Sequence, residues 1–279
     1  MFWELVRILY LFWNINGKNL TNEIVQMIEE HNIGVVILAE AGNLDWQHLL
    51  YELERKGLNF TYCNAFNGQE SDIMVFHLKQ EQIELMKCAR HYSVYKVHNK
   101  DSVYTMFVVH LLSGCFKNES ARITRLTRMS QLFEKIEEEI YEEEEFRSFV
   151  IGDFNLQPFS AGIIGSMSFN ATFSMYKAKE DGVRIVDHEK RRFYFNPMWR
   201  LMGKNEEALG TYYSSSDEGD NSFYWYTWDQ VLIRPALIDQ FNFDEFSIID
   251  SVGSEHLVTQ NQVISRAYSD HLPIKFEIR

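Results

Sequence analysis

Polar side chains follow four of the most apolar segments of this sequence, at the point where each segment ends. Asn14 and Glu40 each close a run of aliphatic or aromatic residues near the start of the chain, and His110 and Asp153 do so further along. One polar terminus is commonplace. Here four such termini carry an amide, two carboxylates and an imidazole. This set predicts that one rim of a sheet is lined with metal ligands and proton carriers.

The chemistry that suits this set of side chains is hydrolysis of a phosphoester. The ester is anionic and repels hydroxide, so neutralising its charge and positioning it dominate catalysis. Carboxylate oxygens such as those of Glu40 and Asp270 are the ligands that Mg²⁺ or Mn²⁺ prefers. A histidine held by a carboxylate has a fixed tautomer and can accept charge during the reaction.

The elements that must position these residues are short buried strands interleaved with helices. Near-continuous apolar runs predict buried strands, and apolar residues at helical spacing predict helices. We predict strands at 6–13, 34–39, 73–78, 92–98, 103–111, 148–151, 183–186, 192–195, 224–233, 245–249 and 273–278. We also predict helices from Thr21, over 46–53 and over 120–144, and a flexible loop at 211–222. This pattern implies two packed sheets covered by helices, an α+β fold, and we expect residues 1–279 to form a single domain.

The net charge of −13 is opposite in sign to that of most proteins that bind polyanions. It is uneven, because residues 134–145 hold eight Glu and one Lys, a net charge of −7 that leaves −6 for the rest of the chain. We interpret this acidic segment as solvated surface, with docking of a protein partner as the alternative. A bound divalent cation would reverse the local potential at an acidic site, so a nucleic acid substrate is still allowed.

Cysteine content and hydropathy bear on the cellular location. Cys63, Cys88 and Cys115 are odd in number and widely spaced, which indicates reduced structural thiols. The apolar N-terminal run carries Glu4 and Arg7 and lacks a cleavage site of small residues, so it does not resemble a signal peptide. No run of about 18 uncharged apolar residues suggests a membrane span. We therefore expect a cytoplasmic protein with no membrane span.

Six short motifs, in this order, resemble those of the endonuclease/exonuclease/phosphatase superfamily. They are Trp13-Asn14-Ile15-Asn16-Gly17, Leu38-Ala39-Glu40, Val109-His110, Gly152-Asp153-Phe154-Asn155 with Pro158, Trp228-Asp229-Gln230-Val231 and Ser269-Asp270-His271. Each motif alone is short enough to occur by chance, but all six in order span residues 13–271 and are specific together. The resemblance implies a four-layer α/β/β/α sandwich of two mixed sheets flanked by helices.

The resemblance also implies a metal cofactor, Mg²⁺ or Mn²⁺. Glu40 would be the principal ligand, and Asn14, Asn16 and Asp270 would complete the metal shell directly or through water. Some members have Asp where this chain has Asn16, which leaves the number of metal ions open. Taken alone, Asn14 and Asn16 could be turn residues before Gly17.

The roles in the reaction that the resemblance implies fall on five residues. Asp153 would orient or deprotonate the attacking water, and Asn155 would hold a phosphate oxygen. His271, oriented by Asp229, would contact the scissile phosphate or act as the base, and the sequence leaves open which of Asp153 and His271 removes the proton. His110 resembles the second histidine of the DNase I and phosphodiesterase branches, and would stabilise phosphate or protonate the leaving oxygen.

Basic and aromatic residues supply candidates for substrate binding. One lies near the start of the predicted long helix, where an N-terminus favours anions. The others come from a segment, 190–200, that mixes cations with aromatic rings and could follow a phosphate backbone and stack bases. The same segment could be an edge strand with its aromatic rings in the core. The candidates are Arg122, Arg191, Arg192, Trp199 and Arg200.

Together these observations predict a metal-dependent phosphodiester hydrolase, with a nuclease acting on DNA or RNA as the leading interpretation. Whether it would act as an endonuclease or an exonuclease is open. One alternative is a phosphatase or phosphodiesterase for a small or lipid phosphoester. Another is a catalytically inactive member of the family that only binds. The intact set of candidate ligands argues against this alternative.

Overall fold

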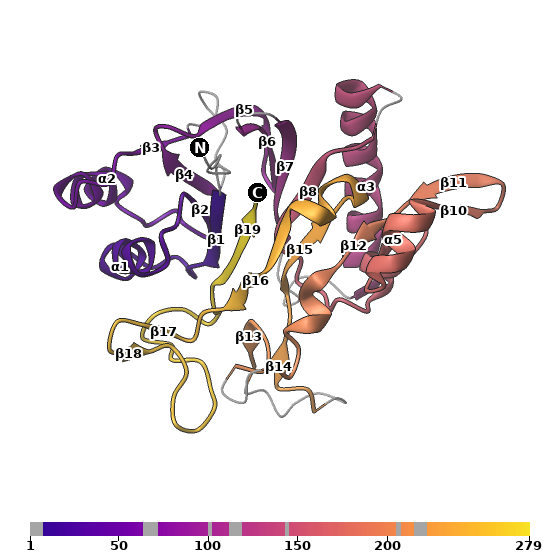
Figure 1. The fold of residues 1–279 in the computed structure, drawn as a ribbon. Coiled ribbons are helices and arrows are strands. Elements are labelled where there is room, and N and C mark those ends of the chain that lie inside the picture. Colours follow the sequence, from indigo (N-terminus) through magenta and orange to yellow (C-terminus); the bar gives the residue numbers. More distant parts are fainter. Residues whose placement is uncertain are drawn as a thin grey trace.

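A computed structural model of the chain describes residues 8–63, 72–99, 102–111, 119–142, 145–204, 208–214 and 222–279. Two β-sheets pack face to face at its centre, and helices cover their outer faces (Figure 1). The predicted α+β sandwich of two mixed sheets flanked by helices is therefore confirmed.

The first sheet contains the N- and C-terminal strands of the described chain. Its spatial order is β16 (Phe241–Ile248), β19 (Ile274–Ile278), β1 (Ile8–Asn14), β2 (Val35–Ala39), β4 (Met74–Leu78) and β3 (Phe60–Tyr62). β1 and β2 are parallel, and the other pairs are antiparallel. Every residue of β2 is buried, which explains its unbroken apolar sequence.

The second sheet is built from the middle of the chain. Its spatial order is β5 (Gln82–Ala89), β6 (Tyr92–Asn99), β7 (Ser102–His110), β8 (Ser148–Asp153), β15 (Asp229–Ile233), β12 (Tyr194–Phe195) and β9 (Ala171–Thr172). β7 and β8 are parallel, as are β12 and β9. Sequence analysis predicted 192–195 as one strand, but β11 (Glu189–Arg192) ends before β12 begins.

Helices and short strand pairs complete the described fold. α1 (Thr21–His31) and α2 (Trp46–Arg55) lie on the outer face of the first sheet, and α3 (Glu119–Tyr141) lies on that of the second (Figure 1). The remaining elements are α4 (Ala161–Ile164), α5 (Met175–Asp181), the 3₁₀ helices η2 (Pro197–Arg200) and η3 (Pro235–Gln240), and the pairs β10 (Val183–Val186) with β11, β13 (Tyr212–Tyr213) with β14 (Trp225–Tyr226), and β17 (Ser251–Val252) with β18 (Glu255–His256).

Alternation along the strands fixes which side chains meet between the sheets. In β1, Tyr10 belongs to the hydrophobic cluster between the two sheets, whereas Trp13 belongs to the cluster beneath α1 and α2. The ring of Tyr10 stacks on Phe276 of β19 at 4.9 Å and meets Phe149 of β8 edge-on at 5.3 Å. These aromatic contacts join the sheets directly, so the position of one sheet's rim depends on the other.

The acidic segment at 134–145 is only partly solvated surface. Glu137 is fully buried, and its carboxylate is paired with the guanidinium of Arg234, which is also buried. Tyr194 donates a hydrogen bond to the same carboxylate at 3.2 Å. Burial without such partners would be costly, so this glutamate serves the packing of α3 on the second sheet. Residues 143 and 144 lie outside the described ranges.

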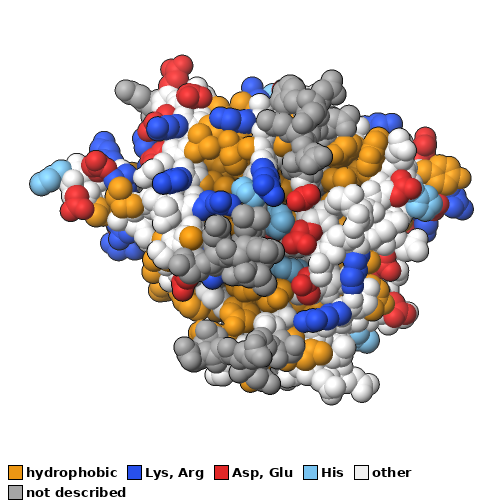
Figure 2. All heavy atoms as spheres, turned by 180° about the vertical axis from the view of Figure 1, so that it is seen from behind, with side chains coloured by type: hydrophobic (Ala, Val, Ile, Leu, Met, Phe, Trp, Pro, Cys, Tyr) orange, Lys and Arg blue, Asp and Glu red, His pale blue; other side chains and the backbone are white. Residues whose placement is uncertain are grey.

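The surface carries charges of both signs. On the face opposite to the view of Figure 1, Lys and Arg side chains are scattered among Asp and Glu (Figure 2). Within the described ranges, no helix combines the length and the hydrophobicity needed to cross a bilayer. Cys63 and Cys88 are free thiols, and Cys115 lies outside the described residues.

Candidate active site

Strand pairing brings the predicted site residues to one end of the sandwich. In the first sheet, Asn14 lies opposite Ala39, so it is next to Glu40 across the parallel pair β1–β2. In the second sheet, Asp153 at the end of β8 lies opposite His110 of β7 on one side and Asp229 of β15 on the other. The rim that the polar strand ends predicted is therefore present in the structure, and both sheets contribute to it.

The amide of Asn14 connects the two sheets at this rim. Its Nδ2 donates to Glu40 Oε1 at 3.2 Å and to Asp153 Oδ2 at 3.1 Å, and the residue is buried. Its Oδ1 accepts a hydrogen bond from the backbone N–H of Asn16 at 3.0 Å. Asn16 is exposed and has a φ of 49°, so it also serves as a turn residue. Asn14 thus holds two carboxylates from different sheets near one point.

Glu40 and His110 form an ion pair beside Asn14. His110 Nε2 lies 3.2 Å from Glu40 Oε1. The hydrogen bond from His110 lowers the pKa of Glu40, against the effect of burial. Burial opposes the charged form of His110, but the hydrogen bond to Glu40 and the charge of Asp153 outweigh it, so the pKa of His110 is raised. The side chain of Glu40 is 38% exposed, which leaves it accessible to a ligand from solvent.

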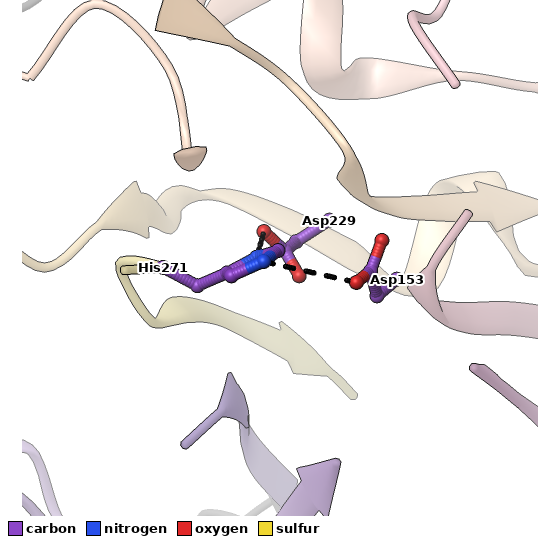
Figure 3. A group of neighbouring side chains, drawn as sticks. All are labelled: Asp153, Asp229 and His271. Carbon is purple, nitrogen blue, oxygen red and sulfur yellow. Dashed lines mark hydrogen bonds and ion pairs between the residues drawn. The ribbon is translucent and has the colours of Figure 1, made fainter. Parts of the chain in front are cut away.

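His271 lies between two buried carboxylates (Figure 3). Its Nδ1 donates to Asp229 Oδ2 at 2.8 Å, and its Nε2 lies 3.8 Å from Asp153 Oδ2. Burial disfavours the imidazolium, yet Asp229 and Asp153 together raise the pKa of His271 to about 10. Burial, with a contribution from Asp229, raises the pKa of Asp153 to about 6, although His271 acts in the opposite direction. At neutral pH these values correspond to an ionised Asp153 beside a protonated His271.

The loop that carries Asp270 and His271 is pinned to the first sheet. Ser269 donates from Oγ to the carbonyl oxygen of Asn14 at 2.7 Å, and Trp13 donates from its indole to the carbonyl oxygen of His271 at 2.9 Å. Asp270 is half-buried, and its charge contributes to the raised pKa of His271. The structure therefore places Asp270 at the same rim as His271.

Unusual backbone conformations mark the points where strands end at this rim. Glu40 and Asn155 have φ values of 51° and 50°, in the left-handed region that non-glycine residues adopt infrequently. Gly152 has a φ of 151°, and a Cβ at this position would lie 1.9 Å from the carbonyl oxygen of Val109 in the neighbouring strand β7. The glycine before Asp153 is therefore required by the close approach of β7 and β8.

The donor set fits a hard divalent cation. Four carboxylates surround the rim, those of Glu40, Asp153, Asp229 and Asp270, and two histidines cannot neutralise all of them. Asp229 Oδ1 is buried and has no hydrogen-bond partner among the described residues. Ligand atoms of Asp153, Asp229 and His271 lie within 4.8 Å of one another, so this group could hold a metal ion. A histidine that is protonated at neutral pH is a poor metal ligand, so carboxylate oxygens such as those of Glu40 suit the cation better.

The backbone around Asn155 is held by its neighbours. Its backbone N–H donates to Asp153 Oδ1 at 2.8 Å, and its Nδ2 donates to the carbonyl oxygen of Leu111 at 2.8 Å. Arg122 of α3 donates to the carbonyl oxygen of Asn155, also at 2.8 Å. Arg122 therefore lies against the loop that carries two candidate catalytic residues.

The other candidates for substrate binding have partners within the protein. Arg191 pairs with Glu189, and Arg192 pairs with Glu134 at 3.2 Å. The remaining two lie near aromatic rings: the guanidinium of Arg200 is 4.3 Å from the ring of Phe243, and Trp199 of η2 contacts Phe159 and Phe173. The structure brings Arg122 to the rim, whereas Arg191 and Arg192 pair with acidic side chains.

Two contacts to the rim were missed by sequence analysis. Thr211 Oγ1 accepts a hydrogen bond from the backbone N–H of Asp229 at 3.1 Å. Tyr212 stacks on Trp228 with ring centroids 4.0 Å apart and meets the ring of His271 at 4.8 Å. The sequence predicts a flexible loop at 211–222, but Tyr212 and Tyr213 form β13, and residues 215–221 lie outside the described ranges. The β-forming pair Tyr212-Tyr213 was the signal that could have found this strand.

Comparisons of the sequence with protein-family models and with curated proteins give no match. Comparison of the structure is informative. A family member from Bacteroides thetaiotaomicron, described as an endonuclease/exonuclease/phosphatase family protein, aligns over 98% of this chain and 98% of its own, with a TM-score of 0.57 and 14% identity. The chain has the endonuclease/exonuclease/phosphatase fold.

Two further structures with the endonuclease/exonuclease/phosphatase fold are described in different terms, one by a bound DNA product and the other by its activity. TDP2 of D. rerio, in complex with a single-strand DNA product, aligns over 98% of this chain and 99% of its own, with a TM-score of 0.53 and 15% identity. A mannosyl-6-phosphatase from B. thetaiotaomicron VPI-5482 aligns over 98% and 99%, with a TM-score of 0.54 and 14% identity. Proteins of this fold thus act on phosphoesters of different kinds.

Proposed function

We propose that this chain is a divalent-metal-dependent phosphodiester hydrolase that cleaves nucleic acid. The observation that carries the proposal is the convergence of both sheets at one rim, where Asn14 bridges Glu40 and Asp153 and where His271 lies between Asp229 and Asp153. Such a concentration of carboxylate, amide and imidazole groups suits the transfer of a phosphoryl group to water.

In this proposal the metal-binding residues are Glu40 and Asp270, with Asn14 and Asn16 completing the shell directly or through water. A Mg²⁺ or Mn²⁺ ion held there would neutralise the charge that builds up on the phosphoryl oxygens. The partly exposed carboxylate of Glu40 would exchange its contact with His110 for a contact to the cation. His110 would then be free to stabilise the phosphate or protonate the leaving oxygen.

The proton balance favours Asp153 as the base. With its pKa raised to about 6, Asp153 is ionised at neutral pH yet basic enough to accept a proton from water. With its pKa raised to about 10, His271 keeps its proton and would contact the scissile phosphate as a cation. Asp229 would orient His271, and Asn155 would hold a phosphate oxygen. Of the two residues between which the sequence left the choice open, Asp153 is therefore the base that we propose.

A nucleic acid is the substrate that we favour, since a structure of the same fold holds a DNA product. The net charge of −13 opposes binding driven by phosphate contacts alone. The second candidate is a small phosphoester, and it is supported by the mannosyl-6-phosphatase of the same fold. Nothing among the described residues supports docking of a protein on the acidic segment.

The first experiment tests the reaction class. Purified protein should hydrolyse bis(p-nitrophenyl) phosphate with Mn²⁺ or Mg²⁺ and lose that activity in EDTA. Glu40→Ala, Asp153→Ala and His271→Ala should each lower the rate by about a hundredfold or more. Asp239→Asn removes an exposed carboxylate, paired with Lys179, and serves as the matched control. Turnover that is independent of metal, or unchanged rates in the three alanine variants, would refute the proposed mechanism.

A second experiment separates the two substrate classes. Single-stranded DNA, duplex DNA, RNA and sugar phosphates are compared under the same metal conditions. Release of inorganic phosphate from a sugar phosphate, without cleavage of any polynucleotide, would replace the nuclease with a phosphatase. Cleavage of a polynucleotide would establish a nuclease. Cleavage at internal bonds would show an endonuclease, and cleavage at terminal bonds would show an exonuclease.

A further inference from the structure

Four aromatic rings form a partly exposed row on the rim of the second sheet. Phe173 and Phe159 lie on either side of Trp199, at 5.2 Å and 5.9 Å between ring centroids. Phe223 continues the row, 6.2 Å from Phe159. Phe173 is 67% exposed, Phe223 is 54% exposed and Phe159 is 38% exposed, which is unusual for large apolar side chains.

The row is continuous with the candidate active site. Phe223 lies 6.2 Å from Tyr226, which lies 5.1 Å from Trp228. Trp228 stacks on Tyr212, and Tyr212 meets the ring of His271. We call these seven rings the aromatic track. It leads from the candidate catalytic histidine across the surface to Phe173.

Strand register explains why the track follows the rim. β9 and β12 run parallel, and both run toward the end at which β15 begins with Asp229. Phe173 directly follows β9, and Trp199 lies in η2, which follows β12. Asn196, at the start of that turn, donates from its side chain to Gln230 of β15 at 2.9 Å. The outer rings therefore stand on the same edge as the catalytic residues, on neighbouring strands.

We propose that the aromatic track binds the unpaired bases of a single-stranded nucleic acid whose scissile phosphate lies at His271. This inference rests on the proposed function and narrows its substrate class. Every base has a π-face, so a row of rings binds a strand by stacking without reading its sequence. An acidic protein gains little from contacts to phosphates, whereas stacking does not depend on net charge.

The spacing of the rings favours a single strand over a duplex. Neighbouring outer rings are 5.2 to 6.2 Å apart. Consecutive bases of a duplex are only about 3.4 Å apart and are covered by one another. A strand that follows the track must therefore separate its bases, which costs least when they are not paired. Stacking on the protein then replaces stacking between the bases.

The test compares an oligonucleotide with a small ester in variants of the outer track. Wild-type enzyme, Trp199→Ala and Phe173→Ala are assayed with Mn²⁺ on a short single-stranded oligodeoxynucleotide and on bis(p-nitrophenyl) phosphate. Each variant should raise the ratio of the oligonucleotide KM to the small-ester KM by about tenfold, the size of one lost base–ring contact. Trp199→Phe keeps a ring, so its ratio should lie close to the wild-type value.

Tyr51→Ala is the matched control, because Tyr51 is an exposed ring on α2, which covers the other sheet. Its ratio should equal that of wild type. If the ratio is unchanged in Trp199→Ala and Phe173→Ala, the aromatic track does not bind the substrate. Equal wild-type KM values for single strand and matched duplex would also refute the proposal. In both cases the protein would still be a phosphodiesterase. Wild-type enzyme that cleaves neither substrate would instead refute the proposed function. Variants that lose only hydrolysis of a phospholipid in phosphatidylcholine vesicles would point to a lipid and also overturn the proposal.

Discussion

Replacing Asp229 with asparagine should change when His271 carries its proton. Asp229 accepts the hydrogen bond from His271 Nδ1 at 2.8 Å, and both residues are buried. Asparagine has nearly the same size and keeps an oxygen that can accept this bond. The Asp229→Asn variant therefore removes one negative charge while leaving the position of the imidazole nearly unchanged.

The size of the effect follows from the pKa of His271. Burial alone would lower this pKa below 6.5, and the two aspartates instead raise it to about 10. A rise of that size favours the protonated form by roughly 5 kcal/mol. Asp229 makes the larger contribution, and loss of one adjacent opposite charge shifts a pKa by about 1–3. We therefore expect the pKa of His271 to fall to about 8 in Asp229→Asn.

The sign of the pH dependence is the same for stability and for activity. A histidine whose pKa is raised in the folded state contributes stability that is complete below 6.5 and is lost as pH rises through about 10. The proposed mechanism uses the same protonated form. In Asp229→Asn, activity should therefore fall at a lower pH, near 8. The stability contribution of His271 should be smaller, and its loss, which starts above pH 6.5 in both proteins, should be complete near pH 8 instead of about pH 10.

NMR titration of the imidazole in metal-free protein measures the pKa of His271 directly. Urea unfolding at pH 7 and pH 9 measures the stability, and the pH–rate profile with Mg²⁺ measures the activity. Asp239→Asn is the control, since its carboxylate is 79% exposed and pairs with Lys179. If His271 in Asp229→Asn titrates at the same pH as in wild type, our account of the buried triad is wrong.

Two further predictions follow from the same rim. The acidic limb of the pH–rate profile should lie near the Asp153 pKa of about 6, because activity appears as this carboxylate loses its proton. Asp153→Asn should lower the rate at pH 7 by about a hundredfold. If the acidic limb persists in this variant, it belongs to another group. Gly152→Ala should lower the free energy of unfolding by about 3 kcal/mol, measured in urea, because its Cβ would lie 1.9 Å from a carbonyl oxygen. Gly57→Ala, at a positive φ but with nothing within 4 Å, should cost only about 1 kcal/mol; equal losses would exclude the steric explanation.

The sequence predicted strands best where they are buried on both faces. The prediction at 34–39 agrees with β2, and the prediction at 103–111 agrees with β7 to within a residue at each end. β5 was missed because it is an edge strand in which Ile83 and Cys88 are the two buried residues, so polar side chains interrupt its pattern. The unbroken apolar run that signals a strand requires two covered faces, and most side chains of β5 are not buried.

The sequence indicated which strand-end residues the structure brings together at the rim, but not how they contact one another. Residues at strand ends could be recognised because a polar residue after an apolar run is visible in the sequence. The bridge from Asn14 to both Glu40 and Asp153 was not visible, because it depends on how one sheet docks on the other. The contact of Tyr212 with His271 has the same origin, since an isolated bridge brings two distant segments together.

Because the rim is divided between two sheets, the distances between its side chains depend on how the whole interior is packed. Asn14 and Glu40 come from one sheet, whereas His110, Asp153 and Asp229 belong to the other. Between the sheets, the ring of Phe149 meets Tyr10 and Phe276 edge-on, and these contacts set the distance between the two sets of residues. Neither sheet alone holds the whole set of candidate residues. A small shift between the two layers would separate these side chains, so the geometry of the rim depends on buried aromatic residues of the core.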